Sequence, residues 1–225
     1  MLSRSGGAST ATIAQDSGPY YYPNKMGRII LTAMEDIMGL HGVNAVLNRA
    51  GLNHLVGNFP TNNLDLGFAF GEVSAIQETL DDLFGVRGGR GLATRAGRET
   101  FKYALKEFMP VLGIADLAFR PLPLGIKLKI GLEVFAETFN KFTDQVVQLG
   151  QDVDSHLWTI RRCPVCWGRQ TEGPCCHLAV GLLQESLHWV SNGKNFRVRE
   201  VECIAAGHEV CLITIDKKPV VSQAV

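Results

Sequence analysis

The first 162 residues of the chain contain no cysteine, and the sequence as a whole has no excess of charge of either sign. It has 22 lysines and arginines against 22 aspartates and glutamates, so it lacks the basic surplus that accompanies nucleic-acid binding. The same balance argues against attraction to an anionic membrane surface. Long apolar runs are also missing: the most apolar stretch, residues 108–119, contains Pro110 and Asp116 and is too short to span a bilayer.

The beginning of the chain lacks the apolar run that a secretory signal needs. We interpret residues 1–19 as a disordered tail, with a cleaved targeting segment as the alternative, and residues 220–225 as a second tail. A chain without a signal stays in the cytoplasm, where thiols remain reduced. Residues 20–219 show no internal repeat and no long linker, so we expect a single domain.

Helices dominate the first two-thirds of the predicted structure. Apolar residues recur three and four positions apart in residues 25–39, a pattern typical of an amphipathic helix that ends at Gly39. Glycine-rich residues 85–91 are expected to break the chain between two later helices. The remaining helices are predicted over residues 43–50, 71–84, 95–109 and a segment that follows three prolines and ends near Gly150.

The pattern changes in the last third of the chain. Residues 155–163 alternate as a strand does, residues 175–193 have helical spacing, and residues 195–207 and 208–219 indicate two strands joined by a tight turn at Gly207. Helices followed by antiparallel strands favour an α+β fold, in which N-terminal helices pack on a small antiparallel sheet.

All six cysteines lie in this last third, and in a reducing compartment such a cluster indicates metal or redox chemistry before disulfides. Small buried thiols without a function are the alternative. The turn at Gly207 brings Cys203 and Cys211 together, and zinc accepts thiolate, imidazole and carboxylate ligands. On a regular strand, however, Glu200 and Cys203 point to opposite faces, and so do Glu202 and Cys203. A carboxylate and Cys203 therefore reach one metal only across a bulge or a bend.

The segments CHLAVGLLQESL and FRVREVECIAAGHEVC resemble the 4-vinyl-reductase (4VR) domain family. They are especially similar to the sensory domains of activators that control phenol and toluene degradation. That family has a helical cysteine followed five residues later by glycine, then Glu-x-x-Cys, and then a cysteine eight residues on. Cys176, Gly181, Glu200, Cys203 and Cys211 match this motif. The resemblance implies a structural zinc bound by Cys176, Glu200, Cys203 and Cys211, while the earlier helices agree with the family only in general pattern.

The resemblance also implies a fold and an assembly. The fold is that of small TRAPP trafficking subunits and, more distantly, of haem-based nitric-oxide sensors, a superfamily of signalling and Golgi-transport ligand-binding domains. The family forms homodimers through its N-terminal helices, a role that residues 25–39 suit, with a core helix as the alternative. The ATPase module and helix-turn-helix of the activators have no counterpart in this sequence, so we do not expect a complete activator.

The sequence departs from the family by additional cysteines in CPVCWGRQTEGPC. Cys163, Cys166 and Cys175 together with His177 are candidate ligands of a second metal. A redox-active CxxC pair and reduced structural thiols are the two alternatives.

No catalytic residue is predicted. Residues 85–91 are rich in glycine but do not follow a predicted strand and lack the G-x-G-x-x-G spacing, so they do not indicate a dinucleotide site. No Ser-His-Asp grouping is visible, and a zinc with four protein ligands leaves no position for water and is structural. These features do not favour an enzyme.

The candidate ligand-binding residues are large apolar side chains around the proline-rich segment, for which ordinary core packing is the alternative. The resemblance implies a pocket between helices and sheet, lined by Phe101, Phe108, Leu112, Phe119, Phe135 and Trp158. The preferred hypothesis is a stand-alone, zinc-stabilised sensory module for a small hydrophobic or aromatic molecule. The alternatives are a bacteriochlorophyll or tetrapyrrole biosynthesis protein, acting as vinyl reductase or pigment-precursor carrier, and a TRAPP-like scaffold with an acyl-binding pocket.

Overall fold

The structure, a computed structural model, describes residues 18–112 and 122–220. The predicted tails therefore fall almost entirely outside the described residues. The elements are β1 (Tyr21–Pro23), α1 (Asn24–Arg49), the 3-10 turn η1 (Asn53–Leu55), β2 (Leu66–Ala69), α2 (Phe70–Leu112), α4 (Leu124–Phe142), β3 (Val147–Gln151), β4 (Ser155–Ile160), α5 (His177–Val190), β5 (Phe196–Glu202), the 3-10 turn η2 (Ile204–Ala206) and β6 (Cys211–Pro219).

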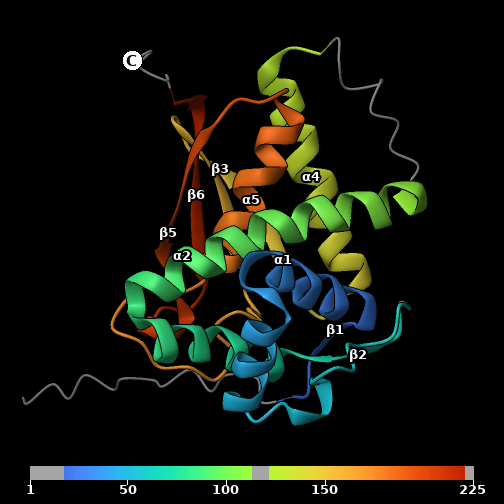
Figure 1. The fold of residues 1–225 in the computed structure, drawn as a ribbon. Coiled ribbons are helices and arrows are strands. Elements are labelled where there is room, and N and C mark those ends of the chain that lie inside the picture. The colour runs from blue at the N-terminus through green and yellow to red at the C-terminus, as the bar shows by residue number, and fades with distance from the viewer. Residues whose placement is uncertain (1–17, 113–121, 221–225) are drawn as a thin grey trace, which may run out of the picture.

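The predicted α+β architecture is confirmed. Four antiparallel strands form a sheet in the order β3-β4-β6-β5, and a small second sheet pairs β1 with β2. Helices α4 and α5 contact the larger sheet, α2 crosses α5, and α1 packs on α2 (Figure 1). The helices of the first half thus reach the sheet mainly through α5, which is the helix of the predicted metal-binding unit.

Glycine conformation explains where the helical prediction was right and where it was wrong. Gly39 interrupts α1 with a φ of 73°, and Gly85 interrupts α2 with a φ of 69°, a region that glycine reaches without strain. The break at Gly85 was predicted, but residues 86–91 are helical and do not form the predicted turn. Gly89 serves close packing instead, because a Cβ there would lie 2.8 Å from the backbone nitrogen of Asp81.

Helix α4 ends at Phe142, eight residues before the predicted end near Gly150, and residues 147–151 form β3. The side chain of Asn140 explains the stop, because it accepts a hydrogen bond from the Val147 nitrogen at 2.7 Å and donates one to the Val147 oxygen at 2.9 Å. These two bonds turn the chain back along α4 and start the strand. The apolar residues after Phe142 follow the helical period by coincidence.

Helix α1 is, among the described residues, the one helix long and apolar enough to cross a membrane by length and composition. In this fold it is a core helix: Leu31, Met34 and Val46 are fully buried. Its apolar composition is therefore accounted for by packing against α2 and the β1–β2 pair.

Candidate metal centre and apolar pocket

Four segments of the last third bring all six cysteines into one buried cluster. Cys163 and Cys166 lie in the loop after β4, and Cys175 and Cys176 lie at the start of α5. Cys203 follows β5 and Cys211 begins β6. All six are buried and none forms a disulfide. Strand pairing brings the loop to the hairpin, because Ile160 at the end of β4 is the register partner of Cys211.

A β-bulge in β5 resolves the difficulty over Glu200. Glu200 pairs with Ile213 while Glu202 pairs with Leu212, so the register shifts between the two glutamates. Glu200 consequently points to the cluster: its Oε2 accepts a hydrogen bond from the Cys176 nitrogen at 2.7 Å. Its Oε1 is buried and has no hydrogen-bond partner among the described residues. A buried carboxylate oxygen without a partner is where a metal ligand would be expected.

The ligand atoms form two overlapping groups of four, each with all its atoms within 4.8 Å of one another. The first, which we call the hairpin set, is Cys176, Glu200, Cys203 and Cys211, the four residues that the family resemblance implies. The second, the loop set, is Cys163, Cys166, Cys176 and Cys211. Cys175 and His177, proposed from the sequence as partners of Cys163 and Cys166, belong to neither set.

The sulfur–sulfur distances of the hairpin set match the edges of a zinc tetrahedron, which measure about 3.8 Å for a Zn–S bond of about 2.3 Å, and two distances of the loop set are shorter. In the hairpin set, Cys176 Sγ lies 3.9 Å from Cys203 Sγ and 3.8 Å from Cys211 Sγ, and Cys203 Sγ lies 4.0 Å from Cys211 Sγ. In the loop set, Cys163 Sγ lies 3.5 Å from Cys176 Sγ, and Cys166 Sγ lies 3.4 Å from Cys211 Sγ. The residues present therefore fit a thiophilic metal ion.

Burial raises the pKa of Cys176, and a hydrogen bond with Cys163 is the main cause that raises the pKa of Cys166 and Cys211. Burial, and then the charge of Cys203, raise the pKa of Glu200 to about 8. A hydrogen bond with Cys166 is the main cause that lowers the pKa of both Cys163 and Cys203, because it favours their thiolate forms. A buried group of thiolates and a carboxylate needs a compensating cation.

Arg169, which the sequence reasoning missed, lies in the same cysteine-rich loop. Its side chain is 5% exposed and donates to Asp81 of α2 at 2.7 Å. Its Nε and Nη1 are buried without a hydrogen-bond partner among the described residues. Burial opposes the charge of Arg169, but the nearby Cys175 and Asp81 raise its pKa, so this charge lies beside the cysteine cluster. The bond to Asp81 ties the loop to α2. The sequence signal that could have found this residue is an arginine within a cysteine-rich loop.

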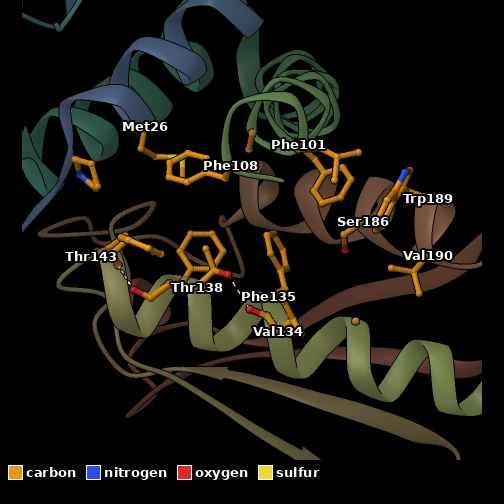
Figure 2. A pocket seen from close by; sticks show the side chains of 16 residues that line it. Met26, Phe101, Phe108, Val134, Phe135, Thr138, Thr143, Ser186, Trp189 and Val190 are labelled. Carbon is orange, nitrogen blue, oxygen red and sulfur yellow. Dashed lines mark hydrogen bonds between the residues drawn. The ribbon is translucent and has the colours of Figure 1, made fainter. Parts of the chain in front are cut away.

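A second feature is an apolar pocket between α2, α4 and α5, with a volume of about 830 Å³ including the part open to solvent. Phe101 and Phe108 come from α2, Phe135 from α4 and Trp189 from α5 (Figure 2). The full lining is Pro23, Met26, Phe101, Ala104, Leu105, Phe108, Gly131, Val134, Phe135, Thr138, Phe139, Phe142, Thr143, Ser186, Trp189 and Val190.

Three of the six residues predicted for ligand binding line this pocket: Phe101, Phe108 and Phe135. Trp158, on β4 and 2% exposed, lies behind the wall, where its ring packs on Phe135 with the centroids 5.5 Å apart. It lines a smaller adjoining cavity instead. Phe119 lies outside the described residues, and the side chain of Leu112 is not described.

Comparison with known proteins begins with the region that holds the cysteine cluster. Residues 158–217 match the model of the V4R domain. The match confirms the resemblance drawn from the sequence, and this V4R segment contains every candidate metal ligand. No curated protein matches the chain.

Solved structures match over most of the chain. The Fe(II) unliganded H-NOX protein from K. algicida is 12% identical with a TM-score of 0.57, over 90% of this chain and 99% of that one. A trafficking protein particle complex subunit 3 from Naegleria fowleri, covalently bound to palmitic acid, is 15% identical with a TM-score of 0.50. That match covers 65% of this chain and 89% of the subunit. At these identities the likeness shows the fold alone, and that fold agrees with the one expected from the sequence.

Proposed function

We propose that this chain is a zinc-stabilised module that binds a small hydrophobic or aromatic molecule and acts as a sensor rather than as an enzyme. The apolar pocket between α2, α4 and α5 is the observation that carries the proposal. It is a concave site lined mainly by apolar and aromatic side chains, as small-molecule sites usually are. We further propose that the module forms a homodimer, as its family resemblance implies, and that it works in the cytoplasm.

The pocket favours a ligand with little hydrogen-bonding capacity. Three hydroxyl groups reach its lining, and each already donates to a backbone carbonyl. Thr138 donates to Val134 and Thr143 to Phe139 (Figure 2), and Ser186 donates to Leu183. A polar ligand would leave water without gaining equivalent partners, which costs free energy. Phenyl and indole rings can instead contact an aromatic ligand edge-on, as Phe101 and Phe135 already do with each other at 86°.

The zinc is proposed in the hairpin set. Cys176, Glu200, Cys203 and Cys211 would hold it with four protein ligands, so that it would be structural. It would join the start of α5 to the β5–β6 hairpin. Since α5 also supplies Ser186, Trp189 and Val190 to the pocket, the metal would fix one wall of the binding site.

An acyl chain is the second candidate ligand. The trafficking subunit with the same fold is covalently bound to palmitic acid, and the pocket here has an apolar lining of the kind that an acyl chain needs. This reading corresponds to a TRAPP-like scaffold. A tetrapyrrole role would instead be favoured if the purified protein carried a porphyrin-like mass.

The test uses native mass spectrometry of the purified protein, followed by thermal unfolding with naphthalene or palmitic acid added. At a concentration of 100 times Kd a ligand stabilises by about 2.7 kcal/mol. For a chain of this size that raises Tm by about 5–11 °C. A rise in Tm with naphthalene but not with palmitic acid supports an aromatic ligand. A rise with palmitic acid but not with naphthalene supports an acyl chain.

A blocked pocket provides the control. Ala104 is 9% exposed and lines the pocket, so Ala104→Trp should fill part of the space and abolish the ligand-induced rise in Tm. Ala45→Trp places the same side chain on an exposed position of α1 and should preserve the rise. A ligand response that survives in Ala104→Trp would show that the pocket is not the binding site.

A further inference from the structure

We propose that the cysteine cluster binds two thiophilic divalent ions, one in the hairpin set and one in the loop set, with Cys176 and Cys211 bridging them. The inference rests on the zinc of the proposed function and adds a second ion to it. The ligands of the second ion are Cys163 and Cys166, together with the two shared thiolates.

The geometry points to two centres because the sets share an edge. Cys176 and Cys211 are common to both, and their sulfurs lie 3.8 Å apart. Cys203 and Glu200 belong to one set, and Cys163 and Cys166 to the other. Two tetrahedra that share one edge need six ligands, which is the number that the two sets supply together. Each ion would then have four protein ligands, as structural zinc does.

Charge is compatible with two ions. Five thiolates and one carboxylate carry six negative charges when ionised, and two divalent ions reduce this excess to two. With one ion in the hairpin set, Cys163 and Cys166 would keep their protons and the excess would also be two, so the geometry of the two sets carries the second ion. Binding releases the protons of the ligating thiols to solvent.

The same distances argue against an iron–sulfur cluster. In a [4Fe–4S] cluster each cysteine binds a different iron, so that the four sulfurs surround the whole cluster. Here the ligand atoms within each set lie within 4.8 Å of one another and surround a space for one ion. Zinc and cadmium, which accept four thiolates without a redox step, fit this arrangement.

Cys175 provides a matched control. It is buried in the same cluster, and its Sγ lies 3.8 Å from that of Cys203, but it belongs to neither set. Cys175→Ser therefore removes a thiol from the cluster without removing a proposed ligand. Cys163→Ser and Cys166→Ser remove unshared ligands of the loop set, and Cys203→Ser removes an unshared ligand of the hairpin set.

The experiment measures zinc per chain by elemental analysis and native mass spectrometry, after purification under reducing conditions, incubation with zinc and removal of the excess. We expect two ions in the wild type and in Cys175→Ser, and one ion in Cys163→Ser, Cys166→Ser and Cys203→Ser. If the wild type binds only one ion, and Cys163→Ser keeps that ion while Cys203→Ser loses it, the second ion would be overturned and the proposed zinc would stand. If the wild type binds only one ion and Cys163→Ser loses it, or if the wild type binds none, both would be overturned.

Cadmium-113 NMR of the wild type tests the proposal without relying on variants that fold. Two resonances are expected, one for a cadmium with four sulfur ligands and one for a cadmium with three sulfurs and an oxygen. Each should be split by the other ion through the shared sulfurs of Cys176 and Cys211. A single resonance at saturating cadmium would overturn the proposal.

Discussion

Two glycines allow α2 and α5 to cross at very short range, and replacing one of them should separate the helices. A Cβ on Gly181 would lie 2.8 Å from the carbonyl carbon of Thr94 and closer still to its oxygen. A Cβ on Gly97 would lie 2.9 Å from the backbone nitrogen of Leu182. These obstacles are backbone atoms, which cannot rotate away as a flexible side chain can.

The magnitude follows from the separation that Gly181→Ala requires. Ordinary Cβ contacts begin at 3.4 Å, so the helices must part by more than 0.6 Å. A gap of about 0.5–1 Å forfeits a quarter to a half of each contact's dispersion energy. Overpacking costs about 1–3 kcal/mol, and a backbone obstacle places this site at the upper end. Alanine's better helix propensity returns up to about 1 kcal/mol, which leaves a net loss of about 2 kcal/mol.

Thermal unfolding with saturating zinc is the assay, and Gly91→Ala is its control. Gly91 lies in α2 with open space around it, so alanine there should gain up to about 1 kcal/mol from helix propensity. We expect Tm to fall by about 4–8 °C in Gly181→Ala and to rise by about 2–4 °C in Gly91→Ala. If Gly181→Ala unfolded at or above the Tm of Gly91→Ala, the close crossing described here would be refuted.

Two further predictions concern charged groups. Asp81→Asn should destabilise the protein by about 3 kcal/mol in denaturant unfolding, because it leaves the buried Arg169 cation without its partner. Asp82→Asn, in an exposed ion pair, should cost less than about 1 kcal/mol, and equal losses would contradict the pairing. Burial lowers the pKa of His156, so its contribution to stability is present above the ordinary histidine pKa and lost as the pH falls below it. His156→Gln should therefore lose less stability than the wild type on acidification from about pH 7 to about pH 5, and an equal loss in the two proteins would contradict this role.

Much of the architecture could be predicted because it depends on local pattern. Apolar periodicity located the helices, and Gly39 and Gly85 marked their breaks correctly. The strands β1 and β2 were missed because three or four residues are too few to show an alternation. The end of α4 was missed because it depends on the side chain of Asn140, which bonds to a residue seven positions later.

In the candidate metal site, too, local spacing predicted some of the ligands, whereas others depend on contacts between distant segments. The spacing of Cys203 and Cys211 indicated a shared hairpin, and the resemblance added Cys176 and Glu200. Strand alternation alone required a bulge, and the structure has one between Glu200 and Glu202. The grouping of Cys163 with Cys211 depends on the pairing of β4 with β6, which no local pattern encodes. The spacing of the CxxC pair therefore suggested its neighbours Cys175 and His177.

The place of β6 in the sheet has a consequence for how the chain is made. This strand is the last of those that the structure describes, yet it lies between β4 and β5. While the ribosome is still adding it, the two strands that it joins have no common partner and expose unpaired edges. The cluster likewise lacks Cys211 until this strand begins. A chain truncated before β6 would have unpaired strand edges and five exposed thiols that the complete fold buries. Chaperones retain and proteases remove products of this kind.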